Sequence, residues 1–111
     1  MIIRPWEVWK ARPPGIQQEH WFVIFAGEER LRSPTFTQIN GLACFSLRGQ
    51  MRSTDVRLNS ADGFPAPTVC QCDLVYFLEK PALHSCLGTI SYERQQAIKR
   101  KLIEVFRIIP A

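Results

Sequence analysis

The stretch that decides the fold runs from Val69 to Arg107 and reads VCQCDLVYFLEKPALHSCLGTISYERQQAIKRKLIEVFR. Its first part predicts a strand over residues 68–78, because apolar, β-branched and aromatic side chains dominate there. A short strand over residues 82–88 follows, and the pattern then changes to a helical period after Ser91. The order of these elements indicates a β fold that is closed by one terminal helix.

The terminal helix has a clear start. Ser91 carries a hydroxyl that can accept a hydrogen bond from an unpaired amide of the first turn, and Glu93 complements the positive end of the helix dipole. Apolar residues recur at helical spacing and predict one buried stripe, which consists of Ile98, Leu102, Val105, Phe106 and Ile109. Pro110 is expected to end the helix.

Four more strands are expected before Val69. Alternation and composition place them at residues 7–11, 20–26, 42–47 and 54–58. The strand at 20–26 is apolar almost throughout, which predicts a central strand that is buried on both faces. Residues 12–19 contain Pro13-Pro14-Gly15 and form a loop, residues 27–40 are polar with a short helical turn, and residues 59–67 are rich in turn formers.

This element order predicts a small, strongly bent antiparallel barrel, mainly β with a C-terminal helix, as a single domain over residues 1–111. An open antiparallel sheet with the helix across one face has the same element order and remains the alternative.

Composition bounds the class of protein. No apolar run approaches the roughly 20 residues of a membrane span, and the start of the chain lacks the features of a signal peptide, so a cytoplasmic protein without a membrane partner is expected. The four cysteines, Cys44, Cys70, Cys72 and Cys86, lie in apolar stretches and are predicted to be buried, reduced thiols. Cys70 and Cys72 lack a second ligand pair at zinc spacing, so neither a metal site nor another cofactor is predicted.

The net charge is +4, and most of the excess lies in the last helix. A basic helix face attracts phosphates or an acidic peptide, although such a face is also commonly just solvated.

Three motifs give the chain a family likeness. The run Val69-Cys70-Gln71-Cys72-Asp73-Leu74-Val75, the later Leu87-Gly88-Thr89-Ile90-Ser91 and the terminal helix resemble the end of a MazF/PemK-type toxin, where a "V-x-x-C-D-Q-I" strand, an "x-G-x-L-S" turn and a final helix come in this order. Glu7-Val8-Trp9 is similar to the opening "G-D-V-W" strand of that family. The resemblance implies an SH3-like barrel of the MazF/PemK/CcdB type.

The resemblance also implies an activity. Members of the family cut single-stranded RNA without a metal, through attack of the ribose 2′-hydroxyl on the adjacent phosphate, and they act as homodimers that an antitoxin protein silences. Their catalytic arginine lies in "K-x-R-P" at the start of the second strand, and a threonine or serine lies in "P-L-T-S" at the end of the third. This chain has His20-Trp21 at the first place and Phe45-Ser46-Leu47-Arg48 at the second.

A replacement set of catalytic residues follows from these positions. If the second and third strands end side by side, His20 is a candidate acid or base, Ser46 a candidate hydroxyl, and Arg48 a candidate phosphate clamp. Their alternative role is structural, at strand ends and in a turn.

Further candidates are expected to contact RNA. Arg12, on the loop before the second strand, is a candidate phosphate contact, and Trp6 and Phe64, flanked by proline or glycine, are the aromatic residues most expected to be exposed for base stacking. Core packing or a subunit interface is the alternative for both rings. Glu7 is a candidate general base, but its place in the first strand favours a charge on an edge strand.

Two functions remain open. The first is an endoribonuclease toxin of a toxin–antitoxin module. The second is a domain that keeps the toxin fold without catalysis and binds nucleic acid or protein, since fold alone does not establish a reaction.

Overall fold

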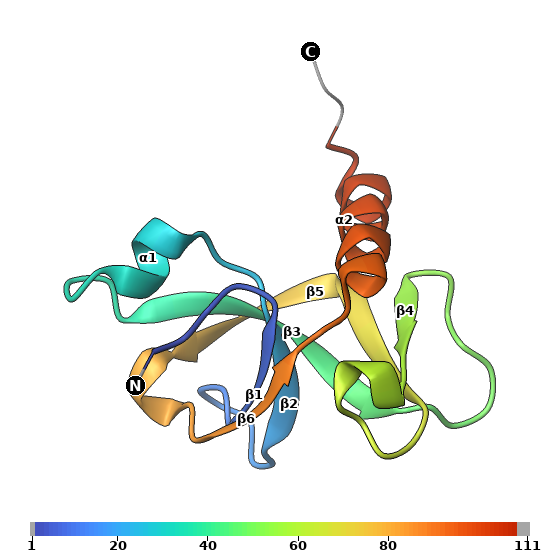
Figure 1. Ribbon diagram of the computed structural model, residues 1–111, viewed down its shortest axis with the longest axis horizontal. Helices are drawn as coiled ribbons and strands as arrows, with labels where there is room; N and C mark the ends of the chain where they lie inside the picture. Colours follow the sequence, from blue (N-terminus) through green and yellow to red (C-terminus); the bar gives the residue numbers. More distant parts are fainter. Residues whose placement is uncertain (1, 109–111) are drawn as a thin grey trace.

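The computed structural model describes residues 2–108 and contains one six-stranded antiparallel sheet with two helices beside it (Figure 1). The strands are β1 (Glu7–Ala11), β2 (His20–Ile24), β3 (Gln38–Ser46), β4 (Asp55–Leu58), β5 (Thr68–Glu79) and β6 (Ser85–Thr89). The helices are α1 (Glu28–Arg32) and α2 (Tyr92–Phe106), and two short 3₁₀ turns are η1 (Ser60–Asp62) and η2 (Lys80–Ala82). The strand order is β4-β5-β3-β2-β1-β6.

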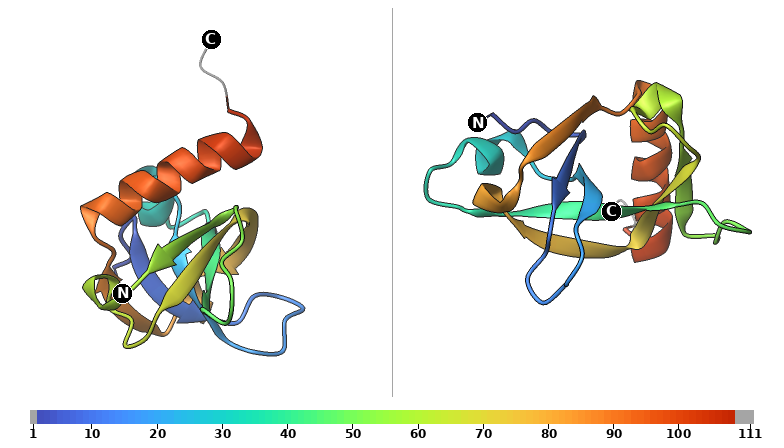
Figure 2. Two further views of the ribbon diagram at one scale, coloured as in Figure 1. Left: turned by 90° about the vertical axis from the view of Figure 1, so that its right-hand side faces the viewer. Right: turned by 90° about the horizontal axis from the view of Figure 1, so that it is seen from below.

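The bend of the sheet lies in β5. Cys70 is opposite Cys44 of β3, whereas Val75 is opposite Leu42, so a longer piece of β5 spans a shorter piece of β3. An irregularity of this kind raises the local twist and bends the strand, and the sheet curls into a half-barrel (Figure 2). Among the described residues β4 and β6 do not pair with each other. The predicted bent antiparallel fold with a C-terminal helix is confirmed, with the barrel open along these two edges.

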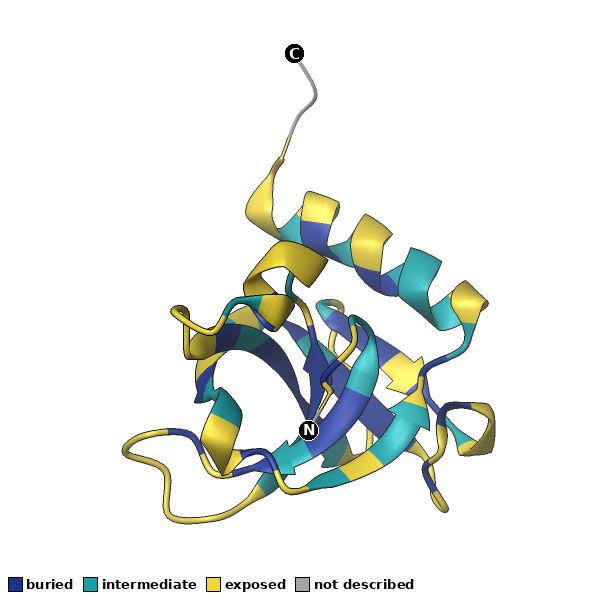
Figure 3. Cartoon of the chain, turned by 60° about the vertical axis from the view of Figure 1, so that its left-hand side comes forward, coloured by how far each residue is buried: buried dark blue, intermediate teal, exposed yellow. Residues whose placement is uncertain are grey.

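Alternation along the central strands divides the core between the two faces of the sheet. Val8, Val23 and Leu42 point to the face that α2 covers, where they join Ile98 and Leu102. The other face carries a second cluster, which includes Trp9, Phe22, Ile24, Ile39 and Leu78 together with Leu31 of α1. Buried residues accordingly occupy the middle strands, while the loops are exposed (Figure 3). The prediction that the strand starting at His20 is buried on both faces is confirmed for Phe22, Val23 and Ile24.

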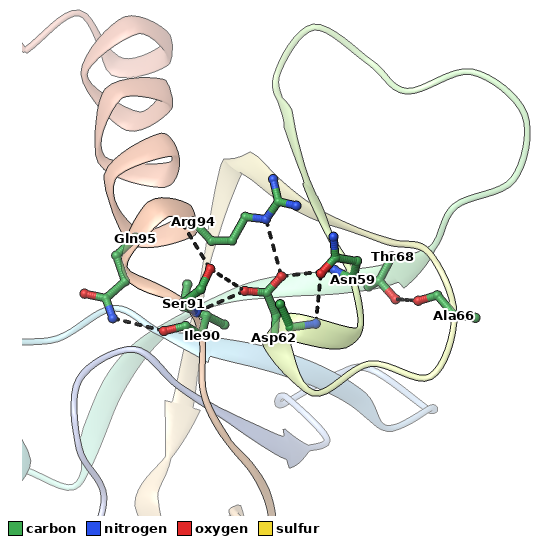
Figure 4. Close-up of polar contacts among 9 residues, drawn as sticks. Asn59, Asp62, Ala66, Thr68, Ile90, Ser91, Arg94 and Gln95 are labelled. Atoms are coloured by element: carbon green, nitrogen blue, oxygen red, sulfur yellow. Dashed lines mark hydrogen bonds and ion pairs between the residues drawn. The ribbon is translucent and has the colours of Figure 1, made fainter.

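Helix α2 begins where the sequence predicted. The Ser91 hydroxyl accepts a hydrogen bond from the Arg94 amide, and the Ser91 amide and hydroxyl both donate to Oδ1 of Asp62 at 3.0 Å (Figure 4). Oδ2 of Asp62 accepts the Asn59 amide at 3.0 Å and lies 3.4 Å from Nε of Arg94. We call Asn59, Asp62, Ser91 and Arg94 the helix anchor, because it ties η1 to the first turn of α2.

The end of α2 differs from the prediction. The helix ends at Phe106, since Arg107 takes a left-handed backbone conformation with φ 54° and its amide bonds to the carbonyl of Ile103. Of the predicted stripe residues that the structure describes, Ile98 and Leu102 are buried and Phe106 is 47% exposed, because the last turns of α2 extend past the sheet (Figure 1). Ile109 and Pro110 lie outside the described residues.

Other boundaries also move. β2 ends at Ile24, so Phe25 and Ala26 lie outside it, and β3 begins earlier than predicted, at Gln38. β6 begins at Ser85 because Ala82 belongs to the turn η2. β1 is an internal strand between β2 and β6, so Glu7 is not the edge charge that was expected. Its carboxylate accepts the Arg4 amide at 2.6 Å and the Trp9 indole N–H at 3.1 Å.

The cysteines are all free thiols, and three of them, Cys44, Cys70 and Cys72, are buried as predicted. Hydrogen bonding to the Cys44 and Cys72 thiols, together with burial, raises the pKa of Cys70 well above its ordinary value, so this thiol stays protonated and inert. Cys86 is exposed, contrary to the prediction, because it lies on the edge strand β6. None of the helices within residues 2–108 is long and apolar enough to cross a membrane.

Candidate functional site

A pocket of about 580 Å³ lies where the ends of β1, β2 and β3 meet the turn at residues 64–66. Its charged side chains are Lys10, Glu19 and Arg48, and its hydroxyl side chains are Ser46 and Thr68. His20, Trp21, Cys44, Phe45, Phe64, Pro65 and Ala66 complete the lining. The three residues that the sequence predicted as catalytic, His20, Ser46 and Arg48, therefore border one pocket.

Strand register explains one side of this pocket. Lys10 of β1 is opposite Trp21 of β2, and Trp21 is opposite Cys44 of β3. Residues that face each other across an antiparallel pair have side chains on the same face, so these three side chains form a row, and the Lys10 ammonium lies 5.3 Å from the centre of the Trp21 ring. A cation next to an aromatic face suits an anionic, ring-bearing ligand such as a nucleotide.

Ser46 belongs to the same face as this row, because it lies two residues after Cys44 on β3. Arg48 follows just beyond the strand end and is exposed. A guanidinium beside a hydroxyl can hold two oxygens of a phosphate and place a hydrogen-bond donor next to them. Ser46 and Arg48 therefore suit a phosphate at the mouth of the pocket.

His20 borders the pocket from a different direction. Its ring lies 4.9 Å from the ring of Phe45 and 6.5 Å from the ring of Phe22, both measured between centroids. Side chains alternate along a strand, so His20 and Phe22 point away from the face that Trp21 shares with Ser46. The His20 ring thus lies at the rim of the pocket, on the opposite face from the Ser46 hydroxyl.

Phe64 does not have the exposure that the sequence suggested. Its side chain is 5% exposed and packs into the core cluster under α2. The turn η1 directs the chain inward at Phe64, because the helix anchor fixes Asn59 and Asp62 against α2. Phe64 lines the pocket but has no free face for base stacking.

The two other predicted RNA contacts lie outside this pocket. Arg12 lines two other hollows, one of about 670 Å³ that shares Lys10 and Glu19 with the pocket and one of about 480 Å³ that shares no residue with it. Trp6 is only partly exposed and packs against Phe25 at a centroid distance of 6.2 Å, with Lys99 of α2 5.8 Å from its ring. Trp6 lines a separate hollow, which has no residue in common with the pocket of Ser46 and Arg48.

Sequence reasoning missed two residues of the site and a third beside it. Lys10 and Glu19 line the pocket, and Nε2 of His84 bonds to Oε2 of Glu19. This hydrogen bond is the main reason that the pKa of the Glu19 carboxyl is lowered, and Lys10 and Arg12 add to the effect. Alternation placed Lys10 on one face of β1, but nothing local to the sequence indicates that His84 meets a residue 65 positions away.

The site has no arrangement of metal ligands. Within residues 2–108, no group of three or more His, Cys, Asp or Glu side chains is placed so that it could hold a metal ion. The side chains that line the pocket bring one carboxylate, one imidazole, one thiol, two hydroxyls and two cations.

Comparison with solved structures identifies the fold. An endoribonuclease from a mycobacterial species, solved in complex with its cognate antitoxin, superposes with a TM-score of 0.82 at 16% identity, over 98% of this chain and 99% of that chain. The Mycobacterium tuberculosis toxin MazF-mt6 gives a TM-score of 0.77 at 18% identity, over 96% and 100%. The fold is that of the MazF toxins.

The likeness is structural. A second mycobacterial endoribonuclease gives a TM-score of 0.79 at 15% identity, over 99% of this chain and 97% of that chain. No protein-family model matches the sequence, and no curated protein matches it either. At these identities the comparison establishes the MazF toxin fold, which the motifs of β5, β6 and α2 predicted. A shared fold does not establish a reaction, which depends on the residues of the site.

Proposed function

We propose that this protein is a toxin-type endoribonuclease of a toxin–antitoxin module, which cleaves single-stranded RNA without a metal. The pocket that Ser46 and Arg48 share with Lys10 carries this proposal, because it joins a phosphate clamp to the Trp21 ring and its Lys10 cation at the ends of β1, β2 and β3. Arg48 takes the place of the family's arginine at the start of the second strand as the clamp, and Ser46 supplies the hydroxyl. The whole length of residues 1–111 acts as one domain.

A cleavage assay tests the proposal. Purified protein is incubated with end-labelled single-stranded RNA in the presence of EDTA, with the DNA of the same sequence as a control. We expect cleavage of the RNA alone, because the nucleophile is the ribose 2′-hydroxyl. Arg48→Ala is expected to lower kcat/KM about 100-fold, in the range found when a transition-state donor is removed. Arg57→Ala is the matched control, since Arg57 is exposed on β4 and does not line the pocket.

The alternative function is a domain with the toxin fold that binds nucleic acid or protein without cleaving RNA. The basic net charge of +4 supports binding as much as it supports catalysis. Expression of the chain alone in a bacterium separates the two functions. Growth arrest that Arg48→Ala abolishes supports the toxin, whereas normal growth together with salt-sensitive RNA binding and no cleavage supports the binding domain.

An antitoxin protein is the expected partner in the cytoplasm. One structural neighbour was solved in complex with its cognate antitoxin, and the exposed cations Lys99 and Arg100 of α2 suit an acidic segment. Co-expression with the product of the adjacent reading frame, followed by co-purification, tests this partner. Loss of co-purification in 1 M salt, where the Debye length is about 3 Å, would show that charge holds the complex.

A homodimer is the expected assembly. Two exposed aromatic side chains lie close together: Phe77 is opposite Asn40 of β3, and the Phe25 amide bonds to the Asn40 carbonyl at 3.0 Å. Phe77 is 66% and Phe25 38% exposed. Both lie on the α2 side of the sheet, beside the part that the helix covers. Exposed apolar surface of this kind marks interaction sites. Sedimentation is expected to show a dimer that Phe77→Asp converts to a monomer.

A further inference from the structure

Glu19, which lines the pocket, forms a pair with His84, which lies beside it. The two residues directly precede β2 and β6, the strands on either side of β1. Oε2 of Glu19 contacts Nε2 of His84. A carboxylate can only accept, so Nε2 of His84 carries the proton of this hydrogen bond. In the neutral ring Nδ1 then accepts from the Ser85 hydroxyl, 3.1 Å away. The His84 amide donates to the carbonyl of Lys10 at 3.2 Å, which holds the imidazole beside β1.

Glu19 has the placement that a base needs. It lines the pocket together with Lys10, Trp21 and Ser46. Glu19 lies just before β2 and lines the same pocket as Trp21 and Ser46. The His20 ring, by contrast, is turned toward Phe45.

The surroundings of Glu19 keep it ionised. His84 from the segment before β6, Lys10 from β1 and Arg12 from the following loop all lower the pKa of its carboxyl, and His84 has the largest effect. The other titratable or charged residues that line the pocket are His20, Cys44 and Arg48. A carboxylate must be ionised before it can accept a proton from a hydroxyl.

We propose that Glu19 is the general base of RNA cleavage and that His84 is the residue that positions it. This inference rests on the endoribonuclease function proposed above and names the group that starts the reaction. The substrate is a single-stranded RNA whose scissile phosphate lies between Arg48 and Lys10, with the ribose of the preceding nucleotide against Glu19.

The step balances with the groups at hand. Glu19 takes the proton of the 2′-hydroxyl, and O2′ forms a bond to phosphorus as the bond from phosphorus to O5′ breaks. The departing O5′ takes a proton from a water molecule in the open pocket. Arg48 and Lys10 face the negative charge that develops on the other phosphate oxygens. The products are a 2′,3′-cyclic phosphate and a 5′-hydroxyl end.

Glu19→Gln tests the base directly, because the amide keeps the shape of the side chain but cannot take the proton. We expect kcat to fall about 100-fold or more, with KM within about twofold, since a general base contributes roughly 10²–10⁴. Glu104→Gln on α2 is the matched control, because Glu104 is exposed and does not line the pocket. Circular dichroism checks that each variant is folded.

The positioning role of His84 has its own readout. His84→Ala removes the hydrogen bond that lowers the pKa of Glu19, so this pKa rises and the acidic limb of the plot of log kcat against pH moves to higher pH. His84→Gln, whose amide can donate to Glu19, is expected to restore most of the rate. An acidic limb that stays in place in His84→Ala overturns the positioning role.

A substrate with sulfur in place of the leaving O5′ isolates the base, because a thiolate leaves without a proton. Wild-type protein is expected to cleave this substrate, whereas Glu19→Gln stays slow. If wild-type protein cleaves RNA and Glu19→Gln does so equally fast, Glu19 is not the base and the endoribonuclease function stands. If wild-type protein cleaves neither substrate, the endoribonuclease function itself is wrong.

Discussion

Asp62 and Glu19 are both carboxylates with a nitrogen partner from a distant part of the chain, and they differ in burial. The Asp62 side chain is 0% exposed, and its two oxygens meet amides, a hydroxyl and a guanidinium of the helix anchor. The Glu19 side chain is 44% exposed and borders an open pocket. The comparison teaches that a carboxylate saturated with protein donors serves the fold, whereas one that solvent and ligands can reach is available for chemistry.

The physical reason is desolvation. A buried carboxylate has lost its water, so removal of its side chain leaves several donors without partners. An exposed ion pair loses little when one member is removed, because water replaces it. Changes in the helix anchor should therefore alter stability with activity intact, and changes in the pocket should do the reverse.

Asp62→Ala is expected to have the largest effect on the free energy of unfolding. It leaves the amides of Asn59 and Ser91 without their acceptor and Arg94 without its partner. We expect the free energy of unfolding to fall by about 3–5 kcal/mol, as when one partner of a buried charged network is removed. Urea unfolding at 25 °C measures it. A loss below about 1 kcal/mol would mean that the anchor does not hold α2 on the sheet.

Ser91→Ala probes the same anchor at its helix side. The change removes the cap that accepts the Arg94 amide, while the Ser91 amide still donates to Asp62. A loss of about 1–2 kcal/mol in unfolding free energy is expected, which is the range for N-cap residues. Ser60→Ala serves as the control, because Ser60 is an exposed residue of η1, with a change within about 0.5 kcal/mol.

Lys10→Gln sharpens the other side of the comparison. The ammonium lies beside Trp21 in the pocket, so its loss should lower kcat/KM for RNA about tenfold, which corresponds to about 1.4 kcal/mol. The slope of log Kd against log salt should fall by about 0.7 for the lost phosphate contact. Unfolding free energy is expected to change by less than about 1 kcal/mol, the value of an exposed cation–π contact. A destabilised protein with an unchanged salt slope contradicts this role.

Asp73→Ala is expected to have the smallest effect on the free energy of unfolding. Asp73 is about one-third exposed and pairs with Arg52 at 3.0 Å, and Arg52 also pairs with Asp55 at 3.1 Å. Loss of this surface pair should cost about 0.5 kcal/mol and leave RNA cleavage unchanged. The same urea titration measures it. If Asp73→Ala matched Asp62→Ala, burial would not be what separates the structural carboxylates from the rest.

Much of the fold was accessible from the chain itself. The start of α2 at Ser91 and the strand that begins at His20 were predicted correctly, because a cap and an apolar run are local signals. The predicted exposure of Phe64 was wrong, since flanking glycine and proline indicate a turn but do not tell which way the turn directs the ring. Cys86 and Glu7 were misplaced for a related reason, because edge and internal strands look alike in sequence.

The candidate site was accessible only in part. The strand ends suggested His20, Ser46 and Arg48, and the pocket gathers them. The face on which each side chain lies depends on register, which separates the His20 ring from Ser46. The pairing of β1 with both β2 and β6 brings Lys10, Glu19 and His84 together. No local sequence pattern encodes this pairing.

The sequence by itself determined the element types, the cap of the last helix and the motifs of β5, β6 and α2 that match the MazF toxin fold, because periodicity and capping act between residues close in the chain. The tertiary structure alone decided the bend of β5, the burial of Asp62 and the meeting of Glu19 with His84. Those features depend on which strands pair and in which register, and that choice is made by the sum of many contacts between residues far apart in the chain.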